Sequence, residues 1–450
     1  MTSVERTSRR RFLETTAAAA AGTWAGGKLY AAGADARPGP NETVNMALIG
    51  CGARGANQVM PSFMALPGVR MVAVCDVNSN HLERGRQKAG GEKTAAYHDY
   101  RKLLEDKSID AVIVATQAHW HVLPAIAACQ AGKDVHLEKP LGNSIGEGRY
   151  VIEAAKKYDR IVQIGTQQRS QEHYGKAVEI VQSGKLGDVS MVEVWDHTYW
   201  APGRGFPPDC DPPPELDWDF YVGPAPMRPY NPNVYYNYGY DWFKLSGAGH
   251  QVAWGVHHFD IVAWAMGVKW PIAASATGGH FAYQDNFEWP NTFSGTLEFG
   301  PGPVAKHGFI LQYTMRMGSR RVRRSHAKCF YGTEATMVVD RSRISIAPEP
   351  KTEKTQDVPG YLLSEEEEIL PADDKFRHSE LFLENVRERK QPEANAETGH
   401  YATNLGHLMN ISWQIGRSIR WDGEKEVVVG DEEANALVSK PYRAPWKLEV

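Results

Sequence analysis

The 450-residue sequence has few cysteines, no excess of charge of one sign, and no long apolar run beyond its first residues. Five cysteines without CxxC spacing predict neither a disulfide framework nor a zinc knuckle, and we expect no bound metal. Fifty basic and 54 acidic residues leave a net charge of −4, which favours no nucleic-acid partner. Without a run of about 18 apolar residues, no transmembrane segment is expected.

The length and composition are typical of a globular protein of two or three domains, at roughly 100–200 residues each. Hydrophobic residues make up 42% of the chain and charged residues 23%, which is enough apolar material to build such cores. We predict two domains after a separate N-terminal segment.

The N-terminal segment contains Ser-Arg-Arg-Arg-Phe-Leu at positions 8–13, a twin-arginine export motif. An alanine-rich stretch and a small-residue site at 34–36 follow, so residues 1–36 are predicted to be a signal peptide. The alternative is a disordered tail that happens to contain the arginines. The signal predicts a periplasmic or otherwise exported protein, and because this route carries folded proteins, it also suggests a cofactor bound before export.

A strand, glycine turn and helix follow in that order. VNMALIG (44–50) reads as a buried strand, and GCGARG (50–55) opens a helical pattern. Gly50 permits a tight turn, Gly52 allows the backbone to approach a pyrophosphate, and Gly55 allows close contact between helix and strand. This order predicts a dinucleotide site.

A second strand, VRMVAVCD (69–76), ends in an acid 21 residues after Gly55. Asp76 is placed to accept hydrogen bonds from both ribose hydroxyls and would repel a 2′-phosphate, which favours NAD over NADP. The alternative is an ordinary glycine loop before a helix, with a solvated aspartate.

Further strands alternate with helical patterns up to residue 166, which predicts a Rossmann-type, doubly wound parallel sheet in a domain spanning residues 37–165. In such sheets ligands lie beyond the carboxyl ends of the strands. Residues 117–121 and 138–140 fall at those ends. The strands are predicted at 44–50, 69–76, 111–116, 134–140 and 160–166.

Alternating segments after residue 188 predict a second α/β domain, residues 166–450, with an open and mostly antiparallel sheet. Residues 378–390 and 398–419 have helical spacing, and the C-terminal helix is able to pack back on the first domain. We interpret residues 201–243 as a long loop, whose aromatic side chains suit either stacking on sugars or a subunit interface.

Four motifs make the chain resemble the Gfo/Idh/MocA oxidoreductase family, in its exported subgroup. They are TQAHWH (116–121), HLEKPLG (136–142), GTQQRS (165–170) and GVHHFD (255–260). The resemblance implies a nicotinamide cofactor and a sugar, sugar derivative or cyclitol oxidised at a secondary hydroxyl. It also implies a homodimer or homotetramer formed through the C-terminal sheet.

The resemblance also implies which residues form the site. Lys139 and His257 match the catalytic positions, and burial is expected to bring the lysine pKa toward neutrality. The alternative for Lys139 is a lysine that merely extends from a strand end into solvent. Arg169, His250, Tyr238 and Trp242 are candidates for substrate contact. The predicted cofactor-binding residues are Gly50, Gly52, Ala53, Arg54, Gly55, Asp76, Thr116, Gln117, Trp120, His121, Glu138 and Lys139.

The stretch GAGHQVAWGVHHFD (247–260) departs from the family pattern, which places an acid four residues before the histidine. That position is Ala253. On one helix His250 and His257 would share a face, and His258 would point away as a structural histidine with satisfied hydrogen bonds. His250 or a tyrosine from 235–240 is the candidate to replace the acid. A metal site at the first two histidines would need a third ligand that the sequence does not identify.

Two functions therefore remain open, besides a sugar-binding protein without activity. The first is an NAD-dependent sugar oxidoreductase whose cofactor stays bound and is recycled, because an exported enzyme lacks free NAD. The second is an NAD-dependent glycosidase or lyase that oxidises a ring hydroxyl transiently, eliminates, hydrates and returns the hydride. The missing acid at Ala253 favours the redox-neutral cycle.

Overall fold

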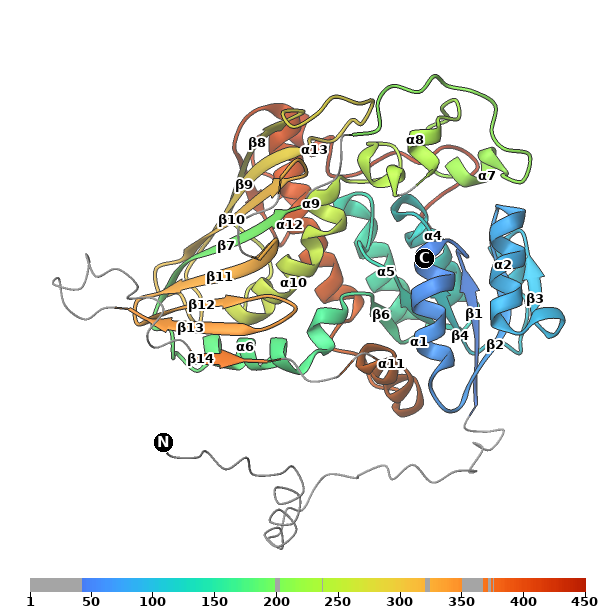
Figure 1. Ribbon diagram of the computed structural model, residues 1–450, viewed down its shortest axis with the longest axis horizontal. Coiled ribbons are helices and arrows are strands. Elements are labelled where there is room, and N and C mark those ends of the chain that lie inside the picture. Colours follow the sequence, from blue (N-terminus) through green and yellow to red (C-terminus); the bar gives the residue numbers. More distant parts are fainter. Residues whose placement is uncertain are drawn as a thin grey trace, which may run out of the picture.

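The computed structural model describes residues 43–198, 203–236, 238–319, 324–349, 367–370, 374 and 376–450. The predicted signal peptide, residues 1–36, lies outside the described residues. The described chain forms two sheets that lie side by side, with helices between them (Figure 1).

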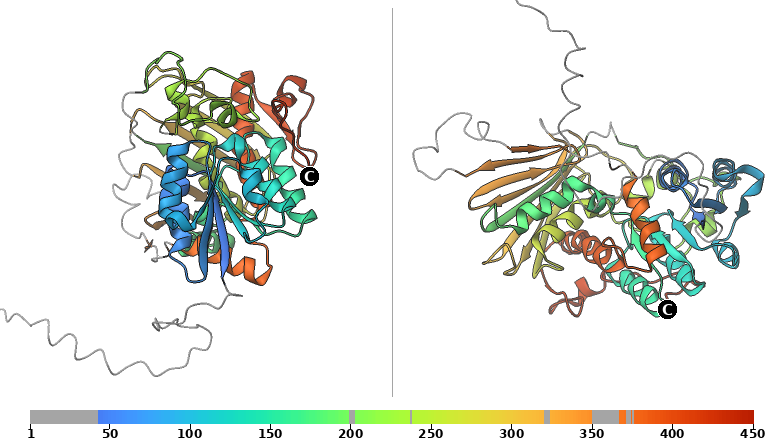
Figure 2. Two further views of the ribbon diagram at one scale, coloured as in Figure 1. Left: turned by 90° about the vertical axis from the view of Figure 1, so that its right-hand side faces the viewer. Right: turned by 90° about the horizontal axis from the view of Figure 1, so that it is seen from below.

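The first domain contains a six-stranded, wholly parallel sheet in the order β3-β2-β1-β4-β5-β6. Helices cover both of its faces (Figure 2), so β1 and β4 are buried along nearly their whole length. The predicted Rossmann-type fold is confirmed. The strands are β1 (Val44–Ile49), β2 (Val69–Cys75), β3 (Ala95–Tyr97), β4 (Ala111–Val114), β5 (Asp134–Leu137) and β6 (Val162–Ile164); the main helices are α1 (Met60–Met64), α2 (Ser79–Ala89), α3 (Tyr100–Leu104), α4 (Val122–Gln130) and α5 (Ile145–Lys157).

The second domain contains a ten-stranded mixed sheet in the order β14-β13-β12-β11-β7-β10-β9-β8-β15-β16. Among the described strands of this second sheet, only the central pair β7 and β10 is parallel and the other neighbours are antiparallel, which confirms the predicted open, mostly antiparallel sheet. Its strands are β7 (Val189–His197), β8 (Ala273–Gly279), β9 (Thr292–Phe299), β10 (Phe309–Arg316), β11 (His326–Gly332), β12 (Ala335–Val339), β13 (Ile344–Pro348), β14 (Glu367–Ile369), β15 (Ile419–Asp422) and β16 (Val427–Val428).

Helices cover the face of this sheet that looks toward the first domain (Figure 2). They are α6 (Glu172–Gln182), α10 (Gly255–Met266) and α12 (Ala396–Ile415). Strand β9 alternates buried and partly exposed residues, as expected for a sheet covered on one face. The core of this domain therefore lies between the sheet and these helices.

Residues 203–236 and 238–249, which we name the strap, contact both domains: residues 215–222 lie against the first domain (Figure 1), and Trp242 and Phe243 belong to the core of the second. The segment predicted as a loop contains three short helices, α7 (Trp218–Val222), α8 (Pro232–Tyr235) and the 3-10 helix η6 (Gly239–Trp242). Its backbone is bonded to the first domain: Ser79 N–H donates to Glu215 O at 2.9 Å, and Asp217 N–H donates to Val77 O at 3.1 Å. The strap is thereby tied to the residues just after β2.

C-terminal segments also contact the first domain. Phe382 and Leu383 of α11 (Arg377–Glu388) belong to the apolar cluster on one face of the parallel sheet, and Trp446 packs against the cluster on the other face. Among the described residues, no helix is both long enough and apolar enough to cross a membrane.

Candidate active site

Two adjoining cavities open at the carboxyl edge of the parallel sheet, as expected for a doubly wound fold. The first has a volume of about 310 Å³ and is lined by the glycine turn, Asp76 and the strap. The second has a volume of about 390 Å³ and lies between Lys139 and the residues around His250 and His257. Both cavities share Arg54, Ala115, Thr116, Tyr238 and Tyr240 as lining residues.

The glycine turn fits a dinucleotide phosphate. Gly50 has φ of +96°, and a Cβ there would lie 2.5 Å from Ala115 O. A Cβ on Gly55 would lie 2.0 Å from Gly50 O, so this residue serves the close packing of the helix. Gly52 has no atom within 4 Å of an added Cβ and lines the first cavity. Its backbone is therefore open to an approaching anion.

Asp76 is held by the backbone around it. Its Oδ2 accepts from Cys51 N–H at 2.7 Å, and its Oδ1 accepts from Asn78 N–H at 2.8 Å. Burial raises the pKa of Asp76, while the nearby His81 opposes that rise. Each carboxylate oxygen keeps a lone pair for a ribose hydroxyl, so the residue fits the predicted role. Arg84 lines the same cavity and would suit a 2′-phosphate. The cavity therefore offers an acceptor for the ribose hydroxyls of NAD and a cation for the 2′-phosphate of NADP.

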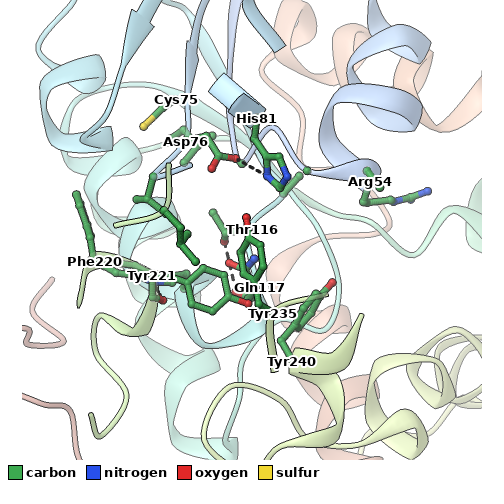
Figure 3. A pocket seen from close by; sticks show the side chains of 18 of the residues that line it. Arg54, Cys75, Asp76, His81, Thr116, Gln117, Phe220, Tyr221, Tyr235 and Tyr240 are labelled. Atoms are coloured by element: carbon green, nitrogen blue, oxygen red, sulfur yellow. Dashed lines mark hydrogen bonds and ion pairs between the residues drawn. The ribbon is translucent and has the colours of Figure 1, made fainter. Parts of the chain in front are cut away.

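The strap closes this cavity opposite Asp76 (Figure 3). Tyr221 and Tyr235 face Asp76 and Thr116 across the cavity. The Tyr235 hydroxyl accepts a hydrogen bond from Asn78 Nδ2 at 2.8 Å, and Trp120 Nε1 donates to Tyr221 O at 2.8 Å. A dinucleotide in this cavity would therefore lie beneath a segment bonded to both sides of it.

The remaining predicted cofactor residues divide between the cavities. Ala53, Thr116, Gln117 and Trp120 line the first cavity, while His121, Glu138 and Lys139 line the second. Arg54 lines both, and its guanidinium forms an ion pair of 2.7 Å with Glu138. Burial alone would raise the pKa of Glu138, but Arg54 lowers it to about 2, so this carboxylate stays charged.

Lys139 lies at the base of the second cavity, at the carboxyl end of β5. Its Nζ donates to Ala253 O at 2.6 Å, so the residue that stands where the family has an acid still contacts the lysine through its backbone. Burial lowers the pKa of Lys139, and the nearby Asp241 and Glu138 oppose that effect. A lysine held in this way exchanges protons near neutral pH more readily than an exposed one.

The predicted single helix through His250 and His257 is interrupted at Trp254, between α9 (His250–Ala253) and α10. Both histidines nevertheless line the second cavity. His257 is buried, and burial together with Lys139 holds its pKa well below the usual value, so its ring is neutral.

The interpretation of His258 as a histidine with satisfied hydrogen bonds is wrong. Its side chain is wholly buried, and neither ring nitrogen has a hydrogen-bond partner within the described part of the chain. Burial lowers its pKa, and its ring lies edge-on to His326 with centroids 6.2 Å apart. It does not line either cavity.

Three of the four candidates for substrate contact line the second cavity. Tyr238 lies at its mouth, and Trp242 is buried with its ring stacked on His250 at 5.8 Å. Arg169 is the exception and the prediction for it is wrong. It forms a buried ion pair of 2.7 Å with Asp260 on α10, which occupies its donors, and it lines neither cavity.

Two acids of the second cavity were missed by sequence reasoning. Asp241, in the strap, has no hydrogen bond to its carboxylate among the described residues, and burial raises its pKa to about 6 despite Lys139 nearby. Asp196, on β7, forms a short hydrogen bond with His250 Nε2. The signal for Asp241 was an acid within the aromatic run YGYDWF, while Asp196 lies in an ordinary strand pattern.

The described residues contain no group of three or more histidine, cysteine, aspartate or glutamate side chains that could hold a metal ion. The site thus offers a proton-exchanging lysine, a free carboxylate and the neutral His257 beside a cavity for a dinucleotide. This set suits the removal of a proton from a hydroxyl next to a hydride acceptor.

Two models of one family match the chain. The model for the Gfo/Idh/MocA oxidoreductase family, NAD-binding Rossmann fold, matches residues 44–166, and the model for the C-terminal alpha/beta domain of that family matches residues 355–448.

Curated relatives match part of the chain. A glycosyl hydrolase family 109 protein of Saccharopolyspora erythraea is 33% identical over 203 residues, which cover 40% of this chain and 44% of that protein. Inositol 2-dehydrogenase of Salmonella typhimurium is 34% identical over 155 residues, covering 33% and 45%. The chain thus spans less than half the length of these curated relatives.

Solved structures match over a larger part of the chain. An aldose-aldose oxidoreductase from Caulobacter crescentus, complexed with glycerol, aligns with a TM-score of 0.61 and 18% identity. Levoglucosan dehydrogenase in complex with NADH and L-sorbose aligns with a TM-score of 0.64 and 15% identity. Both alignments cover 84% of this chain and 99% of the other, and at this identity they show the fold.

Proposed function

Because the chain belongs to the Gfo/Idh/MocA oxidoreductase family, we propose that it is an NAD-dependent oxidoreductase acting on a secondary hydroxyl of a sugar, sugar derivative or cyclitol. The main support for the proposal is that the two cavities adjoin and share Arg54, Thr116 and Tyr240 as lining residues. The cavity of Gly52 and Asp76 adjoins the one that contains Lys139, His257 and Asp241. Relatives and structural neighbours named as inositol and levoglucosan dehydrogenases support the substrate class.

The proposed chemistry divides between the dinucleotide and the side chains. When bound, NAD accepts a hydride from the carbon that carries the substrate hydroxyl. Lys139, in its neutral form, accepts the hydroxyl proton, and Asp241 then accepts this proton from Lys139. His257 is neutral and serves as a hydrogen-bonding partner that orients the hydroxyl.

We further propose that the cofactor stays bound and is recycled in an exported protein. The strap supports retention, because its backbone and Tyr235 are bonded to the residues that follow Asp76. The twin-arginine motif supports export of a protein that already holds its cofactor. NAD is preferred in this proposal because the buried Asp76 would repel a 2′-phosphate. The open face of the second-domain sheet is the proposed subunit contact.

A second candidate function is an NAD-dependent glycosidase or lyase. The relative named as a glycosyl hydrolase family 109 protein favours it, as does Ala253 in place of the acid. In this cycle a ring hydroxyl is oxidised, the neighbouring carbon loses a proton, the glycosidic bond breaks, water adds, and the hydride returns. Asp241 and Lys139 would serve as the bases for both proton transfers.

One experiment tests both candidates. Protein expressed with its full N-terminus is purified, a portion is denatured, and the released nicotinamide is measured. The rest receives monosaccharides and glycosides, with bound NADH followed by fluorescence and products followed by mass spectrometry. Oxidised sugar supports the oxidoreductase, and hydrolysed glycoside without net NADH supports the alternative. Neither product, with no nicotinamide released, would contradict the family-based proposal.

A further inference from the structure

Arg341 lines the second cavity but has no part in the proposed hydride and proton transfers. It lies in the turn 340–343 that joins β12 to β13, and thus reaches the cavity from the second-domain sheet. This turn is far from the Rossmann motifs in the sequence. Arg341 lines only the second cavity and not the first, which contains the glycine turn and Asp76.

The turn that carries Arg341 is fixed by hydrogen bonds from its neighbours. Asp340 Oδ1 accepts from Ser342 N–H at 2.7 Å and from Arg343 N–H at 3.0 Å. The Asp340 backbone oxygen also accepts from His173 Nε2 at 3.0 Å. A rigid turn lowers the entropy lost when its side chain binds a ligand.

The guanidinium of Arg341 is held without an acid partner. It lies over the ring of Trp254, 5.1 Å from the ring centroid, and no carboxylate is within ion-pair distance of it in the described residues. Arg54, the other arginine that lines this cavity, pairs with Glu138, and Arg169 nearby pairs with Asp260. Stacking on an aromatic ring leaves the planar N–H donors of an arginine free in the plane of the guanidinium.

The electrostatics at this point of the cavity are those of an uncompensated cation. Burial and the neighbouring Arg54 lower the pKa of Arg341, although Tyr174 and Asp196 oppose them. Asp196 bonds His250 through Oδ2, while its Oδ1 has no hydrogen-bond partner among the described residues, and it forms no ion pair with Arg341 there. Asp241 is near Lys139, whose charge lowers the pKa of the Asp241 carboxyl, and it forms no ion pair with Arg341 among the described residues. Arg341 is exposed to solvent as a whole residue, but its guanidinium lies over the Trp254 ring and lines the cavity wall.

We propose that the substrate is an anionic sugar, a uronic acid or uronoside, whose carboxylate binds the guanidinium of Arg341. The planar fork of an arginine matches a carboxylate with two parallel hydrogen bonds. The inference rests on the proposed sugar oxidoreductase or glycosidase function and specifies its substrate class. It places the carboxylate at the second-domain side of the cavity and leaves the ring hydroxyls toward Lys139 and His257.

The test uses the full-length protein with its cofactor and measures binding by calorimetry. Glucuronate and galacturonate are compared with glucose and galactose, with glucose 6-phosphate and glucose 6-sulfate as further arms. Uronates should bind at least tenfold more tightly than the neutral sugars. Arg341→Met should reduce uronate affinity roughly 10–100-fold, the range for a charged hydrogen bond, and leave neutral sugars unchanged. Arg341→Lys should retain only part of the uronate affinity of the parent protein.

The matched control is Arg70→Met, an exposed arginine on β2 that lines neither cavity, which should change nothing. Equal affinity for uronates in the parent and Arg341→Met proteins would overturn the proposal. Preference for the phosphate or sulfate ester over the uronates would overturn the carboxylate assignment. Failure of the proposed function is distinguishable, because uronate binding through Arg341 would then persist while no sugar is oxidised or cleaved.

Discussion

Replacing Asp241 by asparagine should lower activity and raise stability together. The carboxyl has a pKa of about 6 in the folded protein, against its usual 3.8, because burial disfavours the charged form. Two pKa units correspond to about 3 kcal/mol, so the ionised side chain destabilises the fold by up to about that amount at pH 7. The pKa of about 6 already includes the opposing attraction of Lys139, so we expect Asp241→Asn to gain about 2–3 kcal/mol at pH 7.

The gain should depend on pH in a definite direction. Between pH 3.8 and about 6 the folded protein binds more protons at Asp241 than the unfolded chain does, so stability falls as pH rises through this window. The asparagine variant lacks this loss. Its advantage should be complete above pH 7, about half as large at pH 5, and close to zero near pH 4.

The assay combines thermal unfolding from pH 4 to pH 8 with turnover on the sugar or glycoside that the product assay identifies. Turnover should fall by ~10²–10⁴-fold if the carboxylate takes part in proton transfer. The matched control is Asp211→Asn, an exposed acid of the strap that lines neither cavity. Undiminished turnover, or a variant that is less stable than the parent protein at pH 8, would refute the reasoning.

Four further predictions concern the cofactor cavity, Lys139, the histidines and the strap. Asp76→Ala should weaken NAD binding and narrow any preference over NADP in titrations of the apoprotein; unchanged selectivity would remove it from the ribose role. Lys139→Ala and His257→Ala should each lower turnover ~10²–10⁴-fold with the cofactor retained. His258→Ala should cost less turnover than His257→Ala, and the reverse order would show that the wrong histidine faces the substrate. Tyr235→Phe removes a 2.8 Å hydrogen bond between the strap and the first domain, so bound NADH should dissociate faster in stopped-flow fluorescence; an unchanged rate would argue against retention by the strap.

The sequence by itself determined the features that depend on neighbouring residues. The strand, glycine turn and helix around Gly52 are a local pattern, and the acid at the end of the next strand is placed by the same register. Lys139 follows a buried strand, so its position at the carboxyl edge of the sheet could be predicted without knowing what lies opposite. The alternation after residue 188 likewise indicated an open, mostly antiparallel sheet.

Only the tertiary structure decided the partners of these residues. Arg169 and Asp260 are 91 residues apart, so the sequence could not show that the arginine was already paired. His258 is buried without a hydrogen bond because neighbouring elements enclose it, which no helical period reveals. Asp241 reaches the site from the strap, and Arg341 from a turn of the distant sheet. Contacts between residues far apart in the sequence determine which side chains are buried. Burial and ion pairing in turn determine which charged side chains are available to bind a ligand or exchange a proton.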